Sequence, residues 1–366
     1  MKQRISLILG VFTVMALSNA VVPILPFFAS EAPSVQGAIF SAYFFGAFLS
    51  VIPAGILGDR YGTKRCIKSG LFLTVVTGAA IFLVPHSPLL VIAARGIEGI
   101  GAGFFVASAL SWVNVQKDSR MLSGYYFAAL NVGLLSGLLI TGWLADFGTT
   151  LGLLVFTVLS MVPFLLSFTL SEEGREEREI APVKDAAYMF RWIYLSSFII
   201  VGTTGVISSL YPEFTGELPI VLSLQLAAMN MGTVITSLVA PRIRIQPVPL
   251  IRVGGIVMAL AVAMAFFAPE FGWIAVILVF AAVGGVVGFV FVAQMEYLAQ
   301  SKIRQGTVVG IFNASAYGGM AFMPFIAGLV VDAVGYSAAF GLATLLCGCV
   351  ALFIGRCECT ILDEPA

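Results

Sequence analysis

Long apolar stretches, separated by short polar segments, run along almost the whole chain. Each stretch is close to the roughly 20 residues that a helix needs to cross a bilayer. Apolar and polar residues do not alternate as they would in the strands of a membrane barrel. The pattern therefore predicts an all-α integral membrane protein with twelve transmembrane helices. The predicted spans are 5–29, 35–57, 67–84, 88–113, 122–145, 150–170, 191–211, 219–241, 249–268, 272–299, 305–331 and 337–356.

The composition agrees with this pattern. Of the 366 residues, 60% are hydrophobic and 10% are charged, whereas about a quarter of the residues in a soluble domain are charged. Because so few charges cannot cover a soluble surface, the surrounding medium must be lipid, and the backbone must satisfy its own hydrogen bonds. The first apolar stretch continues to Phe28, which is too long for the core of a cleaved signal peptide. We expect it to be retained as a helix.

The distribution of charge predicts the orientation. If the N-terminus lies inside, twelve spans place every one of the 19 Lys and Arg residues except Arg95 on the inner side. This is the asymmetry that the positive-inside rule describes. We therefore expect a multi-pass protein of the plasma membrane with both termini in the cytoplasm. The charged residues of the outer loops are all acidic, namely Glu31, Asp146, Glu213, Glu217, Glu270 and Asp332.

The longest polar segment divides the chain into two halves. Residues 171–190 carry mixed charges, which is typical of a solvated cytoplasmic linker. The segment separates an N-terminal six-helix bundle, 1–170, from a C-terminal one with a short cytoplasmic tail, 191–366. A shift of 186 residues aligns the halves, and such a repeat predicts two pseudo-symmetric bundles with the substrate held between them. Under this shift Gly124, Gly133, Gly142 and Asp146 fall on Gly310, Gly319, Gly328 and Asp332.

Between the second and third spans, residues 55–64 read GILGDRYGTK. This segment resembles the signature G-x-L-[AG]-D-[RK]-x-G-[RK]-[RK] that the Major Facilitator Superfamily (MFS) carries between helices 2 and 3. It departs from the signature at Thr63, where a basic residue is usual. Together with the spans and the repeat, the resemblance covers essentially the whole chain. It implies a secondary transporter that works by alternating access.

The resemblance also implies a gate. In the family this segment is thought to latch the inner side shut in the outward-facing state. Asp59 is suited to docking on a positively polarised helix N-terminus, and Gly62 permits a tight turn. The alternative is a polar turn that only fixes the topology. The predicted gating residues are Gly55, Gly58, Asp59, Arg60, Gly62 and Lys64.

The fourth span carries the charges that lie deepest in the predicted membrane. Residues 95–103, RGIEGIGAG, are similar to the family's helix-4 motif, which opens with Arg. If the span begins near residue 88, Arg95 and Glu98 lie about 10 Å and about 15 Å along it. At positions i and i+3 they share a helix face and are able to pair. Because ionisable groups in a membrane are costly, we predict a role in proton coupling or substrate recognition; the alternative is a purely structural ion pair.

Polar residues near the middle of other spans are candidates for lining a central cavity. A mostly apolar cavity with a few amides suits a hydrophobic or amphiphilic solute, whereas a phosphate carrier would need several intramembrane cations. The alternative for each polar residue is an interhelical hydrogen bond worth about 0.6 kcal/mol. The candidates are Asn19, Ser108, Asn131, Gln225, Asn230, Gln294, Asn313 and Tyr317.

Glycines in the fifth span predict close helix packing. Gly133 and Gly137 form a small-xxx-small pattern, and Gly319 is the repeat equivalent of Gly133. In the family, antiporters that exchange drugs for protons often carry a Gly-Pro pair in this helix. Here Leu138 follows Gly137, which weakens a prediction of drug antiport.

The leading hypothesis is a secondary transporter that moves a small hydrophobic or amphiphilic solute outward, with protons as the coupling ion. Uptake of a small metabolite, or uniport, is the alternative. A non-transporting sensor would need a signalling domain, and an enzyme would need a nucleophile with a base or a metal cluster. The chain has one histidine, five cysteines and no G-x-x-x-x-G-K-[ST] loop. We therefore expect no catalytic residue, metal or cofactor, no nucleic-acid partner, and a monomer in the bilayer.

Overall fold

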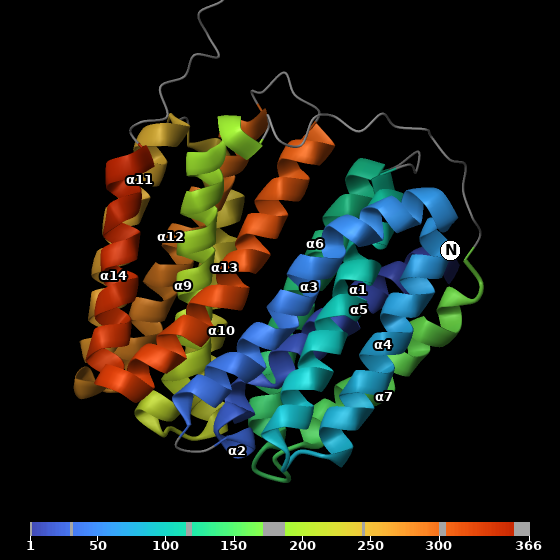
Figure 1. The fold of residues 1–366 in the computed structure, drawn as a ribbon, viewed down its shortest axis with the longest axis horizontal. Coiled ribbons are helices and arrows are strands. Elements are labelled where there is room, and N and C mark those ends of the chain that lie inside the picture. Colours follow the sequence, from blue (N-terminus) through green and yellow to red (C-terminus); the bar gives the residue numbers. More distant parts are fainter. Residues whose placement is uncertain are drawn as a thin grey trace, which may run out of the picture.

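The computed structural model describes residues 2–29, 32–114, 119–170, 187–243, 246–299 and 305–354, and within these ranges every regular element is a helix (Figure 1). The elements are α1 (Lys2–Ala20), η1 (Val22–Ile24), α2 (Leu25–Phe28), α3 (Pro33–Tyr61), α4 (Thr63–Leu83), α5 (Pro88–Asn114), α6 (Ser119–Leu144), α7 (Leu151–Ser167), α9 (Arg191–Thr215), α10 (Pro219–Val239), η2 (Ala240–Arg242), α11 (Pro247–Phe267), η3 (Ala268–Phe271), α12 (Trp273–Ala299), α13 (Gln305–Val334) and α14 (Tyr336–Phe353).

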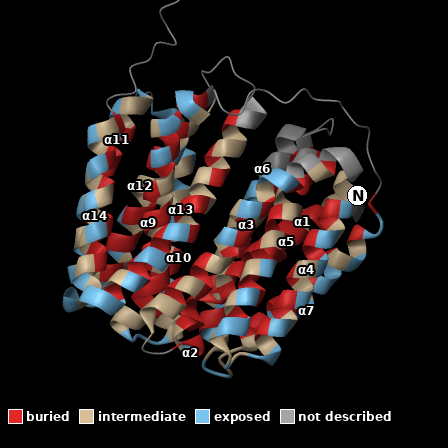
Figure 2. Ribbon diagram, viewed as in Figure 1, coloured by how far each residue is buried: buried red, intermediate tan, exposed pale blue. Residues whose placement is uncertain are grey.

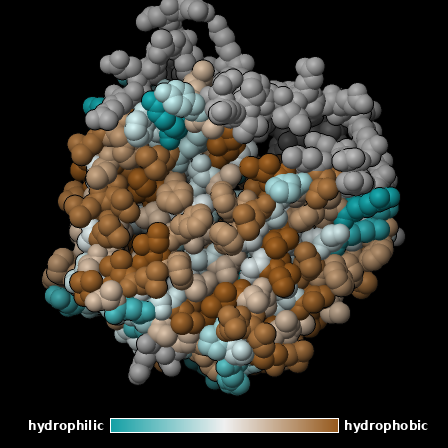
Figure 3. Space-filling model, in the orientation of Figure 1, coloured by the Kyte–Doolittle hydropathy of each residue, from teal (hydrophilic) through white to brown (hydrophobic). Residues whose placement is uncertain are grey.

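The prediction of twelve membrane-crossing helices is confirmed. Within the described residues, eleven helical segments are long and apolar enough to cross a bilayer, and the shorter apolar helix α7 is the twelfth. The first segment, Gln3–Phe28, joins α1, η1 and α2. Pro23 and Pro26 break it because proline lacks the backbone N–H that continues a helix. Figure 3 shows hydrophobic side chains across the middle of one face, with hydrophilic ones toward its ends.

The segment that resembles the MFS signature is the end of a helix. α3 continues to Tyr61, beyond the predicted end at residue 57, and α4 begins at Thr63. The whole turn is therefore Gly62, whose φ of 97° lies in a region that side chains with a β-carbon rarely adopt. The requirement for glycine at this position follows directly from the backbone.

Buried residues concentrate inside each bundle, and exposed apolar residues face outward (Figure 2). Leu89 and Leu345, for example, are 75% and 69% exposed, and many other large apolar side chains are exposed as well. Exposing so much apolar surface to water would be costly. Lipid tails are as apolar as leucine, so these surfaces need no protein partner in a bilayer. The residues 171–186 of the predicted linker lie outside the described residues.

Close glycine contacts reproduce the internal repeat in three dimensions. Gly133 of α6 lies against the carbonyl oxygen of Phe12, and Gly319 of α13 lies against that of Phe198. Both members of the second pair are 186 residues after their equivalents. The fold is therefore pseudo-symmetric at the level of individual helix contacts.

One helix pair departs from this shift by one residue. Gly46 of α3 lies against the carbonyl oxygen of Gly96, whereas Gly232 of α10 lies against that of Ala281. The α3 and α10 glycines differ by 186 positions, but their partners in α5 and α12 differ by 185. In α12, each residue that is structurally equivalent to one in α5 therefore lies 185 positions later, one fewer than the shift of 186 that aligns the two halves.

The two bundles meet toward one end of the helices. We call the end where α7 stops and α9 starts the linker face, and the end where α2 joins α3 the opposite face. Near the opposite face a β-carbon on Gly328 would lie 2.7 Å from the carbonyl oxygen of Pro33, and one on Gly142 would lie 2.8 Å from that of Pro219. Figure 1 shows the bundles closest near α2 and farther apart at the other end.

Candidate functional site

A buried ion pair lies within α5. Arg95 Nη1 donates to Glu98 Oε2 at 2.7 Å, and each residue is 1% exposed. The pair forms as the i, i+3 spacing predicts. Arg95 Nη2 also donates to the carbonyl oxygen of Ser18 at 3.1 Å, so the guanidinium ties α5 to α1. Within the described part of the chain, Arg95 Nε and Glu98 Oε1 are buried and have no hydrogen-bond partner.

An aromatic ring covers the guanidinium. The Cζ atom of Arg95 lies 4.6 Å from the centroid of the Tyr43 ring, which is within the range of a cation–π contact. This approach depends on Gly99, which lies against the carbonyl oxygen of Tyr43 and lets α3 pack directly on α5. A larger residue at position 99 would hold the two helices, and therefore the ring and the charge, apart.

A cavity of about 240 Å³ lies between the two bundles. Its walls come from α1, η1, α3, α5, α6, α9, α10 and α13. Among the described residues that line it, none is charged. The aromatic and polar residues in its walls are Phe40, Tyr43, Phe44, Tyr317, Ser18, Asn19, Thr204, Ser208 and Asn230, with Met15, Met229 and Met320 among the apolar ones.

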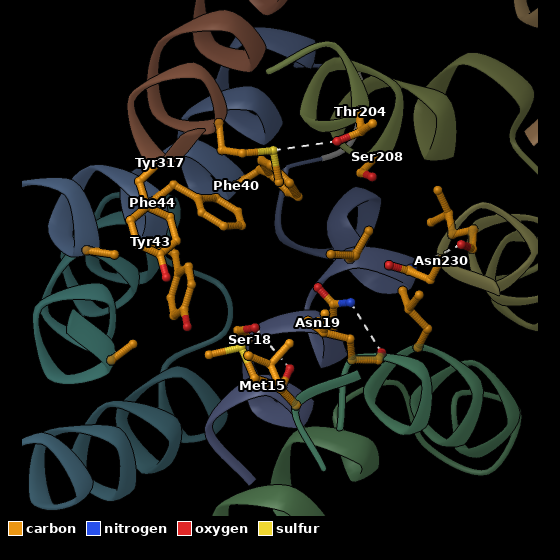
Figure 4. A pocket seen from close by; sticks show the side chains of 18 of the residues that line it. Met15, Ser18, Asn19, Phe40, Tyr43, Phe44, Thr204, Ser208, Asn230 and Tyr317 are labelled. Carbon is orange, nitrogen blue, oxygen red and sulfur yellow. Dashed lines mark hydrogen bonds between the residues drawn. The ribbon is translucent and has the colours of Figure 1, made fainter. Parts of the chain in front are cut away.

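The walls of the cavity differ in chemistry. Figure 4 shows Phe40, Tyr43, Phe44 and Tyr317 together on one side. Asn230 and the hydroxyl residues of α9 lie on the other side, and Asn19 lies between the two. The cavity can thus hold a flat apolar group against rings while polar groups contact the remainder of the solute.

Tyr43 belongs to both the cavity and the ion pair. Its side chain lines the cavity, and its ring also covers Arg95. The charges therefore lie behind one aromatic residue rather than in the cavity wall itself. A solute that moves this ring changes the environment of the ion pair directly.

The sequence model of one protein family, the Major Facilitator Superfamily, matches residues 7–302 of this chain. The chain belongs to this family. The solved structures with a similar fold include a mutant of the nucleoside transporter NupG, with a TM-score of 0.80, 13% identity and coverage of 97% of this chain and 100% of that one. The xylose transporter XylE from E. coli, in a partially occluded inward open conformation, gives a TM-score of 0.77 at 14% identity, over 100% and 99% of the two chains. At this level of identity these likenesses concern the fold alone.

Relatives of this MFS protein are named for different substrates. Multidrug resistance protein 2 of Bacillus subtilis is 24% identical over 213 residues, which is 54% of this chain and 53% of that protein. Sodium-dependent phosphate transport protein 1 of Oryctolagus cuniculus is 31% identical over 126 residues, which is 31% of this chain and 26% of that protein. The chain spans between 21% and 53% of the length of such relatives. The names do not agree on a substrate.

Three of the eight predicted cavity residues of this MFS protein line the central cavity, namely Asn19, Asn230 and Tyr317. The other five are not among the described residues that line it, so a cavity-lining role for them stays a prediction. Sequence position gave their depth in the membrane, but the rotation of each helix about its axis depends on its packing against neighbouring helices. The five are Ser108, Asn131, Gln225, Gln294 and Asn313.

The packing of three of these five is visible in their contacts. Gln294 donates to the hydroxyl of Ser196 at 2.8 Å and joins α12 to α9. Asn131 donates to Phe127 O of its own helix at 2.8 Å. Ser108 is buried, and its hydroxyl lies 3.4 Å from where a β-carbon on Gly58 would be. Gln294 thus makes the interhelical hydrogen bond of the alternative interpretation. Asn131 bonds within its own helix, and the buried Ser108 hydroxyl has no hydrogen-bond partner among the described residues.

Sequence reasoning missed most of the cavity. Thr204 and Ser208 of α9, and the aromatic residues of α3, were not among the candidates. The internal repeat was the available signal for one of them, since Thr204 is 186 residues after Ser18 and both line the cavity. The aromatic residues carried no such signal, because phenylalanine in a membrane span is ordinary.

Three of the six predicted gating residues have described surroundings, namely Gly58, Gly62 and Lys64. Gly58 is buried against α5, Gly62 forms the turn, and Lys64 is half-buried at the start of α4. The surroundings of Gly55 and the side chains of Asp59 and Arg60 lie outside the described part of the structure. The latch therefore stays a prediction.

The predicted packing glycines lie against backbone. Gly133 and Gly137 of α6 lie against the carbonyl oxygens of Phe12 and Ala16 of α1. Gly319 makes the equivalent contact between α13 and α9. Such contacts let helices approach more closely than any side chain would allow.

Proposed function

We propose that this MFS protein is a proton-coupled secondary transporter of the plasma membrane that exports a small hydrophobic or amphiphilic solute. The observation that carries the proposal is an uncharged, largely apolar cavity with a buried ion pair behind one of its walls. The solute occupies the cavity, and Glu98 carries the proton. The protein works as a monomer, with both termini in the cytoplasm.

The ion pair suits a coupling role because its two charge states differ in energy. When Glu98 is ionised, Arg95 has a partner at 2.7 Å. When Glu98 takes up a proton, Arg95 is left as a buried cation with weaker partners, and unpaired buried charge is costly. Arg95 also contacts Ser18 and Tyr43, so a proton on Glu98 alters contacts between α5, α1 and α3.

The arrangement of the bundles suits one state of alternating access. The contacts of Gly328 with Pro33 and of Gly142 with Pro219 close the opposite face. With the termini in the cytoplasm, the opposite face is external, and the structure corresponds to an inward-facing carrier. Export then requires these contacts to part while the linker face closes, through the latch residues near Asp59.

Uptake of a small neutral metabolite is the second candidate. The seven hydroxyl and amide side chains among the described lining residues of the cavity favour it, because they suit a polar uncharged solute. The two directions differ in the sign of the solute flux that a given proton gradient drives. One experiment therefore tests both candidates.

The test uses purified protein in vesicles with an imposed pH gradient and ethidium as the solute. We expect gradient-driven accumulation several-fold above that of protein-free vesicles. In Glu98→Gln vesicles, accumulation no longer depends on the gradient. Glu296→Gln is the matched control, because Glu296 is exposed on α12 and is not among the residues that line the cavity. Equal gradient dependence in the wild type and Glu98→Gln would remove Glu98 from the coupling role.

A further inference from the structure

Two asparagines, one from each bundle, line the cavity. Asn19 belongs to α1 and Asn230 to α10. Asn19 Nδ2 donates to Leu134 O of α6 at 3.2 Å, and Asn230 Nδ2 donates to Leu226 O of its own helix at 3.2 Å. Each side-chain amide is therefore anchored through its nitrogen.

This anchoring fixes the direction of both amide oxygens. A backbone carbonyl only accepts hydrogen bonds, so the nitrogen of each amide must face it and the oxygen must face away. Within the described part of the chain, neither Oδ1 atom receives a hydrogen bond. Figure 4 shows both side chains reaching into the cavity with their nitrogen-to-carbonyl bonds dashed. The cavity thus presents two oriented acceptors that belong to different bundles.

Two of the hydroxyl groups in the cavity, those of Ser18 and Thr204, add to the same preference. Ser18 Oγ donates to Met15 O at 2.9 Å, and Thr204 Oγ1 donates to Val201 O at 2.7 Å. Each of these two hydroxyls directs its single proton at its own helix, with Thr204 Oγ1 also 3.8 Å from the sulfur of Met320, so both offer oxygen lone pairs to a solute. At the two amides and these two hydroxyls, a solute with hydrogen-bond donors is therefore matched better than one with acceptors alone, whereas the hydroxyls of Tyr43 and Tyr317 belong to the aromatic side of the cavity.

The opposite wall accepts a flat apolar group. The Phe44 ring lies 5.1 Å from those of Phe40 and Tyr43 and 6.5 Å from that of Tyr317, measured between centroids. These distances fall in the range of favourable aromatic contacts. An aromatic solute can join this cluster while its polar group reaches toward the asparagines.

An anion finds no matching partner in this cavity. The described lining residues carry no positive charge, and the charge of Arg95 is balanced by Glu98 and covered by Tyr43. Moving a carboxylate or phosphate out of water without a partner is far more costly than moving a neutral polar group. The cavity therefore discriminates against anions.

We propose that the transported solute is an aromatic molecule bearing a hydrogen-bond donor, held between the amide oxygens of Asn19 and Asn230, and that inorganic phosphate and aromatic carboxylates are excluded. This inference rests on the proposed transport function and names the substrate class of the same cavity. Because the two amides belong to different bundles, a solute that reaches both bridges the bundles.

The test is equilibrium binding to the purified full-length protein in detergent. The probes are 1-naphthalenemethanol, which carries a hydroxyl donor, and its methyl ether, which keeps the ring and the oxygen but has no donor. A hydrogen bond contributes about 0.5–1.5 kcal/mol net, so we expect the alcohol to bind roughly 2- to 12-fold more tightly. We expect 1-naphthoate and inorganic phosphate not to compete with it.

Variants assign the preference to the two asparagines. Asn19→Leu and Asn230→Leu each lower the affinity for the alcohol toward that for the ether and leave ether binding within about twofold. Asn131→Leu is the matched control, since Asn131 makes the same kind of bond to its own helix as Asn230 but lies outside the cavity lining. If the variants fail to fold, the comparison of alcohol and ether on the wild type still decides.

Three outcomes would overturn the proposal: equal affinity for alcohol and ether, competition by phosphate or naphthoate, or no binding of either naphthalene probe. The assay contains no membrane and no gradient. Donor-selective binding without gradient-driven ethidium flux would therefore contradict the proposed transport function and leave the solute preference standing. Gradient-driven ethidium flux together with equal binding of alcohol and ether would contradict the solute preference and leave the proposed transport function standing.

Discussion

The side-chain amide of Gln36 in α3 donates a 2.6 Å hydrogen bond to Glu213 Oε2 in α9 and so joins the two bundles at the opposite face. The same nitrogen donates to Ala29 O at 2.8 Å, and Gln36 is fully buried. A β-carbon on Gly37, the next residue, would lie 2.6 Å from Pro324 O of α13. In alternating access the contacts of Gln36 with Glu213 and of Gly37 with Pro324 must break each time the opposite face opens, whereas the bond to Ala29 lies within one bundle.

Replacing Gln36 is expected to favour an opposite face that is open. Gln36→Leu removes the bond to Glu213 and leaves the apolar volume similar, so the closed arrangement loses about 1.5–3 kcal/mol, as for hydrogen bonds to charged groups. The measurement is the distance distribution between spin labels at positions 146 and 270, exposed in place of Asp146 and Glu270, in a cysteine-free background. A longer distance should gain population. Gln246→Leu, at an exposed site, is the control, and an unchanged distribution in Gln36→Leu would contradict the prediction.

Removing one member of the Arg95–Glu98 pair should destabilise the protein more than removing both. Glu98→Leu leaves a buried arginine without its partner, at a cost of about 3–5 kcal/mol. The double variant Arg95→Met with Glu98→Leu leaves no buried charge. In the C-terminal bundle, the residues of α12 that are equivalent to Arg95 and Glu98 of α5 are Phe280 and Val283, 185 positions later. Both are fully buried and apolar. The equivalent site in the other half of the repeat therefore already accommodates an apolar pair.

Thermal unfolding in detergent measures this difference. The double variant is expected to melt above the Glu98→Leu variant, although it carries more substitutions. The single variant Arg95→Met completes the comparison. If the decreases in melting temperature of Arg95→Met and Glu98→Leu simply add in the double variant, the two charges do not stabilise each other.

Adding a methyl group at Gly319 should destabilise the C-terminal bundle. The new β-carbon would overlap Phe198 O, and only a shift of α13 from α9 can relieve the overlap. Overpacking of this kind costs about 1–3 kcal/mol. Gly341→Ala in α14 is the control, because a β-carbon there meets nothing within 4 Å, and alanine favours the helix. The melting temperature should fall for Gly319→Ala alone.

The ring of Tyr43, rather than its hydroxyl, should matter to the ion pair. Within the described residues the hydroxyl is buried without a hydrogen-bond partner, whereas the ring face covers Arg95. Tyr43→Phe is therefore expected to keep wild-type melting and coupling. Tyr43→Leu loses a cation–π contact of about 0.5–2 kcal/mol and opens the pair to the cavity, which should lower both the melting temperature and the gradient dependence of ethidium flux. Equal behaviour of the two variants would show that the ring is dispensable.

Features that depend on neighbouring positions of one helix could be read from the sequence. The apolar stretches predicted the helices, because crossing a bilayer requires a minimum length of apolar residues. The pairing of Arg95 with Glu98 followed from the 3.6-residue period of a single helix. The turn at Gly62 followed from a glycine placed between two helical segments.

Features that depend on how different helices face one another required the tertiary structure. The ring of Tyr43 over Arg95, the joining of Gln36 to Glu213, and the presence of Asn19 but not Asn131 in the cavity all arise between or around helices distant in sequence. Depth in the membrane is set by residue count along one helix. Rotation about the helix axis is set by contacts with neighbouring helices, because lipid solvates every apolar face of a helix equally well. The sequence by itself determined the membrane fold and its buried charges, and only packing decided which polar groups face the solute.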